Sequence, residues 1–338
     1  RHTAAVEKQG RELLASLRPD DKVLVLITRN YGLSDPVLNM GIPRLLLERG
    51  HKVITLSHLP AHDLDLSEDY PNLYWPFGQH ILSGAKLVAH HPNLYAVYLT
   101  NHGCGPDTML SYLFRKEMGD KPYLQIEVDE HFSPVGVITR IEAFLQSLEG
   151  RPAQPLPAGF SLAAVVRRPT AVAAVPERTG GPLLVPDLPP FTAYLRAYCE
   201  AAWKTETRTL RLDSTTLPLG RAETSSKEYL PFPALLGGVL TAAEAESGPF
   251  QVLLPSTQGA EVDGQYPWGV ETVLERRGLC RVKVIAPELE TIPERCPEPD
   301  LLVRAILAGD FLLCAPPEQR DALAPAGVPS WAELEALA

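Results

Sequence analysis

Residues 22–35, KVLVLITRNYGLSD, decide the fold class of this 338-residue chain. A lysine precedes the short β-branched run VLVLIT (23–28), which predicts a strand buried on both faces, as in a parallel sheet. Residues 37–49 predict a helix that ends at Gly50, and KVITL (52–56) predicts the next strand. Strand, helix and strand in this order form a βαβ unit.

The same alternation continues to the middle of the chain. The apolar spacing predicts helices over residues 3–17, 78–90, 107–118 and 135–148, and strands over AVYLT (96–100) and YLQIEVD (123–129). This order is typical of a doubly wound α/β domain, which binds ligands at the carboxyl ends of its strands.

The second half has the same type of pattern after a connection rich in proline and glycine. Strands are predicted over 182–188, 207–212, 250–255 and 280–287, helices over 191–204, 233–246 and 267–278, and a long polar loop over 213–229. We therefore predict two Rossmann-like (flavodoxin-like) parallel-sheet domains with a cleft between them. The predicted boundaries are 1–150, a connection over 151–181, a second domain over 182–325 and a tail over 326–338.

Composition and charge exclude several classes of protein. A net charge of −10 argues against nucleic acid as a partner. Neither a membrane-spanning apolar run nor a signal peptide is visible, so we expect no membrane association and a cytoplasmic location. The five cysteines form no C-x-x-C pair, and no G-x-G-x-x-G follows the first strand, which argues against a zinc ribbon and an NAD site. Because the sequence begins with Arg1, we expect it to be a piece of a longer or processed chain.

Polar residues follow three of the predicted strands of the first half. Because carboxyl ends of parallel strands share one edge, we expect a site that gathers Asn30, Tyr31, Asn101, His102, Cys104, Asp129, Glu130 and His131. The alternative is that these residues only form turns and helix caps, and Asp107 in particular is a candidate N-cap. Arg140, predicted in a first helical turn, is a candidate for binding an anion such as a CoA phosphate.

Cys104 is the most distinctive residue of this group. It stands between Gly103 and Gly105 at a strand-to-helix turn, where backbone N–H groups approach the sulfur and favour the thiolate. A thiolate there is either a nucleophile or a ligand of a metal or cluster. In the first case Cys104 would act with His102 or His131 and with Asp129.

Much of the first half resembles the superfamily of 2-hydroxyacyl-CoA dehydratases and CoA-substrate-specific enzyme activases, which includes benzoyl-CoA reductase subunits and double-cubane-cluster proteins. The resemblance is carried by YGLSDPVLNMGIPRLLLERG (31–50), NLYWPFGQHIL (72–82), NHGCGPDT (101–108), KPYLQIEVDEH (121–131) and GVITRIEAF (136–144). It implies a [4Fe–4S] or double-cubane cluster held by cysteine thiolates, with Cys104 as one ligand. It also implies an ATP-dependent activase domain or subunit as a partner and a homodimer.

Two motifs of the second half resemble the same family but lack its cysteines. LGRAETSSKEYLP (219–231) keeps Glu228, with Tyr229 in the place of a cysteine. QGAEVDGQY (258–266) keeps Gln265 and Tyr266, with Glu261 in the place of another cysteine. The resemblance thus implies that Glu228, Gln265 and Tyr266 face the cofactor.

The remaining cysteines do not restore the ligand set, because a cluster needs three or four thiolates. Cys199 and Cys280 are expected to be small core residues, and Cys296 and Cys314 lie outside the motifs. Three hypotheses remain open. In the first, the chain is a scaffold or binding subunit with a lost or incomplete iron–sulfur site. In the second, it is an active low-potential iron–sulfur protein that transfers electrons or acts as a reductase or dehydratase on a CoA thioester or small molecule, with ligands completed by a missing segment or a partner. In the third, it is an enzyme with Cys104 as nucleophile.

Overall fold

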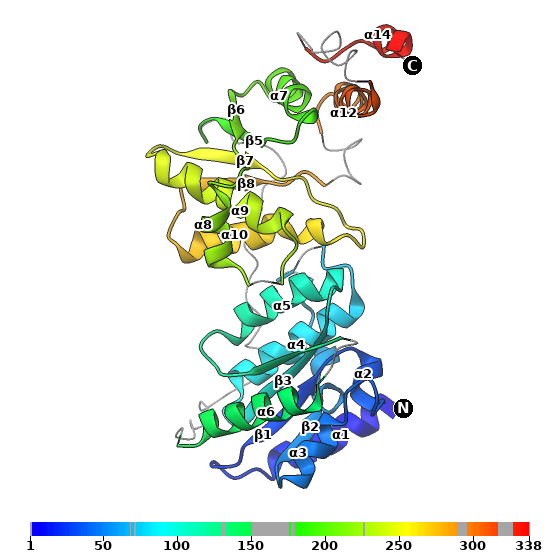
Figure 1. The fold of residues 1–338 in the computed structure, drawn as a ribbon, viewed down its shortest axis with the longest axis vertical. Coiled ribbons are helices and arrows are strands. Elements are labelled where there is room, and N and C mark those ends of the chain that lie inside the picture. The colour runs from blue at the N-terminus through cyan, green and yellow to red at the C-terminus, as the bar shows by residue number, and fades with distance from the viewer. Residues whose placement is uncertain are drawn as a thin grey trace. The chain divides into compact units, whose positions relative to one another are not determined.

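The computed structural model describes residues 2–67, 69–70, 72–129, 133–150, 176, 180–225, 227–288, 296–316 and 327–337. The chain divides into two compact units, Arg1–Pro169 and Thr170–Ala338, and each is an α/β domain with a four-stranded parallel sheet (Figure 1). Two parallel-sheet domains were predicted, and this part of the prediction is confirmed. No helix in the described part of the chain combines the length and apolar character that a bilayer crossing requires.

The first unit contains a sheet of order β2-β1-β3-β4. Its strands are β1 (Val23–Ile27), β2 (Lys52–Thr55), β3 (Leu94–Asn101) and β4 (Leu124–Val128). The register pairs Ile27 with Tyr98 and Asn101 with Val128, so the ends of β1, β3 and β4 lie along one edge. All five residues of β1 are buried, as the continuous apolar run predicts for a central strand covered on both faces.

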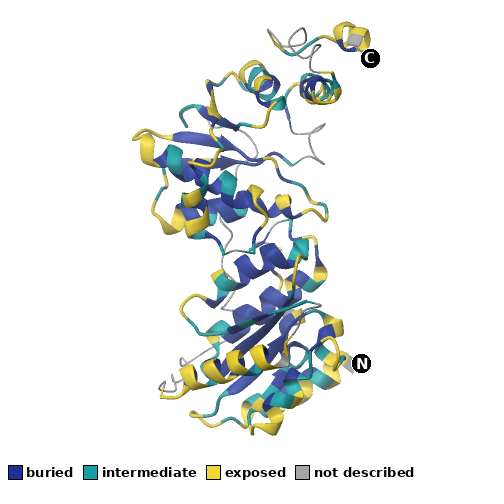
Figure 2. Cartoon of the chain, in the orientation of Figure 1, coloured by how far each residue is buried: buried dark blue, intermediate teal, exposed yellow. Residues whose placement is uncertain are grey.

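Helices cover both faces of this sheet. They are α1 (His2–Ala15), α2 (Asn30–Ser34), α3 (Ile42–Glu48), α4 (Pro76–His90), α5 (Gly105–Met118) and α6 (Pro134–Leu148). One core joins the strands to α3 and α6 through residues such as Ile42, Leu46 and Ile141. On the other face Tyr98 of β3 stacks on Phe114 of α5, with ring centroids 4.1 Å apart. Helix α4 is buried along most of its length (Figure 2).

The second unit repeats this plan with the sheet order β6-β5-β7-β8. Its strands are β5 (Leu183–Pro186), β6 (Thr207–Leu210), β7 (Phe250–Leu253) and β8 (Val282–Ile285). Its helices are α7 (Phe191–Ala202), α8 (Leu217–Glu223), α9 (Pro231–Ala245), η4 (Val262–Gln265), α10 (Tyr266–Arg276), α12 (Pro299–Cys314) and α14 (Trp331–Leu337). A core on one face joins the sheet to α7, α12 and α14.

Several helices differ from the sequence prediction. Helix α3 begins at Ile42 rather than at residue 37, because Met40 and Gly41 adopt left-handed backbone angles, with φ of 55° and 63°. Gly50 ends this helical segment as predicted, with φ of 80°. The short helix α2, the helix α8 inside the predicted polar loop, and the C-terminal helices α12 and α14 were not predicted.

Candidate functional site

Cys104 lies at the corner between β3 and α5, as predicted. It is the N-cap residue of α5, and Gly103 before it has the left-handed φ of 65° that the turn requires. Its side chain is partly exposed. The sulfur therefore stands at the N-terminus of a 14-residue helix, where the helix dipole favours negative charge.

The contact partner of Cys104 is Arg29, which the sequence analysis did not select. The Nη2 atom of Arg29 lies 2.6 Å from the sulfur of Cys104. Arg29 lies two residues after the end of β1, at the N-cap of α2, so the pairing of β1 with β3 brings it to Cys104. Its position after the first strand, next to Asn30 and Tyr31, is the signal in the sequence that could have identified it.

Asp107 holds the guanidinium of Arg29 in place. Its Oδ1 atom lies 2.8 Å from Nη2 of Arg29, and the carboxylate is almost fully buried. Its Oδ2 atom accepts hydrogen bonds from the backbone N–H and the side-chain amide of Asn101, at 2.8 and 2.9 Å. Asp107 is thus not the N-cap that was predicted. It is the third residue of α5 and bonds back to the end of β3.

The surroundings keep Arg29 cationic. Burial opposes the charge of the guanidinium, but the hydrogen bond and the negative charge of Asp107 raise its pKa above the ordinary value. The guanidinium also lies over the ring of Phe77, 4.3 Å from the centroid, which adds a cation–π contact. The site therefore presents a fixed positive charge beside a partly exposed sulfur.

Two further predicted residues join this cluster. The side-chain amide of Asn101 donates to the hydroxyl of Tyr31 at 3.1 Å, and Tyr31 is half exposed. Asn30 opens α2 and is exposed. Gly105 begins α5 next to Cys104.

The other predicted residues of the first unit that the structure describes form no hydrogen bond with Cys104. His102 is exposed, and its Nδ1 atom lies 3.1 Å from a carboxylate oxygen of Glu127. Among the described residues Cys104 has no histidine as a hydrogen-bond partner. Arg140 lies beyond the first turn of α6, contrary to the prediction, and donates to the carbonyl oxygen of Gln125 at 3.0 Å. Asp129 directly follows β4, whereas Glu130 and His131 lie outside the described residues.

The predicted residues of the second unit lie on α8–α10 and the segments between them. Glu228 is buried between α8 and α9, and its Oε2 atom accepts a hydrogen bond of 2.6 Å from Ser225. Gln265 is buried in η4. Tyr266 opens α10, and its ring lies 5.3 Å from that of Phe232. Burial, together with the charge of Asp263, raises the pKa of Tyr266 to about 12.

The first unit supplies one cysteine, Cys104, as a potential ligand of an iron–sulfur cluster. Cys104 is the only cysteine between residues 1 and 169, and the described residues contain no group of three potential metal ligands. Cys199 is buried, and burial with the charge of Glu200 raises its pKa to about 12, so it stays a thiol. Cys280 is exposed, contrary to the prediction, because it precedes β8 in a turn.

Comparison with known families gave one match, to the N-terminal segment of the chain. Residues 1–59 match the CoA enzyme activase uncharacterised domain (DUF2229). The match runs from α1 through β2 and includes Arg29, Asn30 and Tyr31, but it ends before Cys104. Comparison with curated proteins and with solved structures gave no significant match.

Replacing Arg29 by methionine is expected to slow the reaction of Cys104 with iodoacetamide at neutral pH by about tenfold. The reason is that the guanidinium contacts the sulfur that attacks the reagent, and a cation beside a cysteine generally favours its reaction. Peptide-resolved mass spectrometry separates Cys104 from the exposed Cys280 and Cys314. Arg44→Met, which removes an exposed arginine paired with Glu48, is the matched control and should leave the rate unchanged. Equal rates in both variants would contradict a role for Arg29.

Proposed function

We propose that this protein is a divergent relative of the 2-hydroxyacyl-CoA dehydratases and CoA enzyme activases that serves as a binding or scaffold subunit without an iron–sulfur cluster. The match of residues 1–59 to the activase-associated domain supports this relationship. The sequence resemblance of residues 31–148 extends it over the rest of the first unit. An ATP-dependent activase domain or subunit is the partner that we propose on the same grounds.

The contact of Cys104 with Arg29, and the lack of a second cysteine in the first unit, carry this proposal. Its sulfur contacts the guanidinium of Arg29, and the first unit has no second thiol to share a metal with it. In the second unit, Tyr229 and Glu261 offer oxygen atoms, which are poor ligands for a metal that prefers thiolates. The chain thus offers one thiolate at the expected site, where a cluster needs three or four.

Iron analysis of the full chain tests this proposal. We expect no stoichiometric iron or acid-labile sulfide after anaerobic purification, both from the protein alone and after co-expression with an activase. Cys104→Ser should then leave the iron content unchanged. Iron and sulfide in cluster stoichiometry that disappear in Cys104→Ser would show instead an active iron–sulfur protein with ligands from another segment or subunit.

The contact between Arg29 and Cys104 favours a second candidate function, that of an enzyme with Cys104 as nucleophile. A fixed cation and a helix N-terminus are the two features that typically activate a cysteine. The alkylation experiment with Arg29→Met separates this candidate from a purely structural cysteine. A reaction rate for Cys104 no higher than that of the exposed Cys314 would reject the nucleophile.

A further inference from the structure

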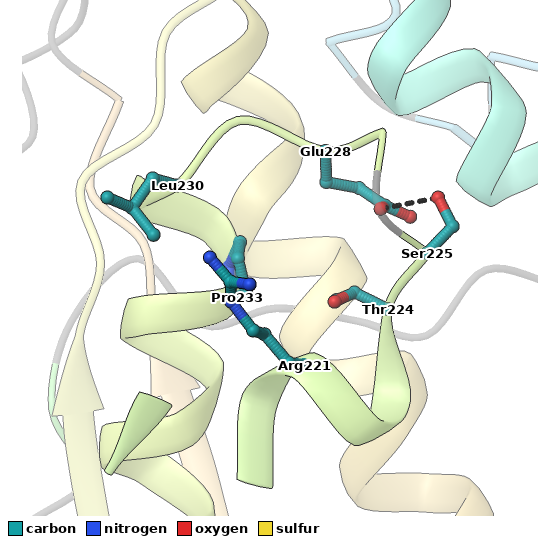
Figure 3. Close-up of a pocket in the computed structure, with 6 residues that line it drawn as sticks. All are labelled: Arg221, Thr224, Ser225, Glu228, Leu230 and Pro233. Atoms are coloured by element: carbon teal, nitrogen blue, oxygen red, sulfur yellow. Dashed lines mark hydrogen bonds between the residues drawn. The ribbon is translucent and has the colours of Figure 1, made fainter. Parts of the chain in front are cut away.

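A small cavity of about 270 Å³ lies in the second unit, between the end of α8 and the start of α9 (Figure 3). This volume suits a ligand smaller than a typical drug-sized molecule. The cavity is lined by six residues that combine two charges, two hydroxyls and two apolar side chains, namely Arg221, Thr224, Ser225, Glu228, Leu230 and Pro233.

Only one of the two carboxylate oxygens of Glu228 has a hydrogen-bond partner among the described residues. Glu228 is 7% exposed, and its Oε2 atom accepts the hydroxyl hydrogen of Ser225. Its Oε1 atom is buried and has no hydrogen-bond partner among the described residues. Because buried polar atoms are almost always paired, Oε1 is an acceptor for which the described residues supply no donor.

Arg221 places a positive charge on the cavity that Glu228 also lines. It is exposed, and it forms neither an ion pair nor a hydrogen bond with another described residue. Arg221 and Glu228 therefore line one cavity without neutralising each other. A guanidinium in this setting can bind a carboxylate through two parallel hydrogen bonds.

We propose that this cavity binds a small zwitterion, an α-amino acid or a close analogue, with its carboxylate on Arg221 and its ammonium group on Oε1 of Glu228. Thr224 donates its hydroxyl hydrogen to the carbonyl oxygen of Gly220, so its oxygen is available as an acceptor. Leu230 and Pro233 offer an apolar wall for the ligand side chain. The cavity gives a ligand class to the binding role proposed above. The proposal that ligand binding is a function of this protein rests on that proposed function.

Titration calorimetry of the full chain tests the inference. The probes are the twenty L-amino acids, followed for each one that binds by the carboxylic acid that lacks the amine and the amine that lacks the carboxylate. We expect saturable binding of at least one amino acid and weaker binding of both analogues by about tenfold or more. No saturable binding at up to about 10 mM, or equal binding of the analogues, would overturn the inference.

Two variants test whether Arg221 and Glu228 bind the charged groups of the ligand. Arg221→Met and Glu228→Gln should each weaken binding of the amino acid by about tenfold or more. Arg208→Met, which removes another exposed arginine of the same unit, is the matched control and should bind as the unmodified chain does. Circular dichroism confirms that each variant is folded, and binding unaffected by both cavity variants would also overturn the inference. The iron analysis is independent, because a cluster would refute the scaffold role and leave the calorimetric result unchanged.

Discussion

Replacing Lys86 by methionine is expected to lower the free energy of unfolding by about 3–5 kcal/mol, because it leaves the carboxylate of Asp69 buried without a cation. Lys86 lies on the buried face of α4, and its Nζ atom is 2.7 Å from Oδ2 of Asp69. The two side chains are only 1% and 7% exposed. Urea denaturation followed by circular dichroism measures the loss.

An ion pair on the surface with the same distance between nitrogen and oxygen provides the control. Lys52 and Asp21 are also 2.7 Å apart, but the side chain of Lys52 is 48% exposed. Lys52→Met should therefore cost less than about 1 kcal/mol. The double variant Lys86→Met and Asp69→Leu should recover much of the loss, since it removes both charges. Equal effects of Lys86→Met and Lys52→Met would contradict the interpretation of Lys86 and Asp69 as a buried pair.

Gly220→Ala is expected to destabilise the second unit by about 3 kcal/mol, which corresponds to a decrease in Tm of roughly 6–12 °C. Helices α8 and α9 pack closely at this glycine. A Cβ atom at residue 220 would overlap the carbonyl oxygen of Pro233 and would lie 2.7 Å from the backbone nitrogen of Gly237. Backbone atoms cannot move aside as a flexible side chain can.

Differential scanning calorimetry measures this effect against a matched glycine. Gly248 has open space where a Cβ atom would be placed, and its φ lies outside the left-handed region. Gly248→Ala should therefore change the free energy of unfolding by no more than about 0.5 kcal/mol. A similar Tm for the two variants would show that α8 and α9 separate easily.

The strands were predictable from sequence because each is a short apolar run covered on both faces. The bounds of all eight differ from the prediction by at most two residues. Helix α8 was missed because its position depends on packing against α9 at Gly220, which no local pattern reveals. Helix α12 carried a readable signal, since Leu302, Ala305 and Leu312 repeat at helical spacing and are buried.

The candidate site was only partly predictable. Local spacing identified Cys104 and the convergence of strand ends, and the structure places Tyr31, Asn101 and Cys104 in one cluster. The bond from Arg29 to Asp107 joins residues 78 positions apart in the chain. It depends on the neighbouring placement of β1 and β3, which is known only once the strand order is known.

The strand order gives each half of the chain a counterpart in the other half. Both sheets place the second strand of the unit outside the first, followed by the third and fourth. The corner after β3, which holds Cys104, thus has as its topological equivalent the corner after β7, which leads to Gln265 and Tyr266. The two units thus share one sheet topology within a single chain. A substitution at either corner can be compared with one at the equivalent corner of the same molecule.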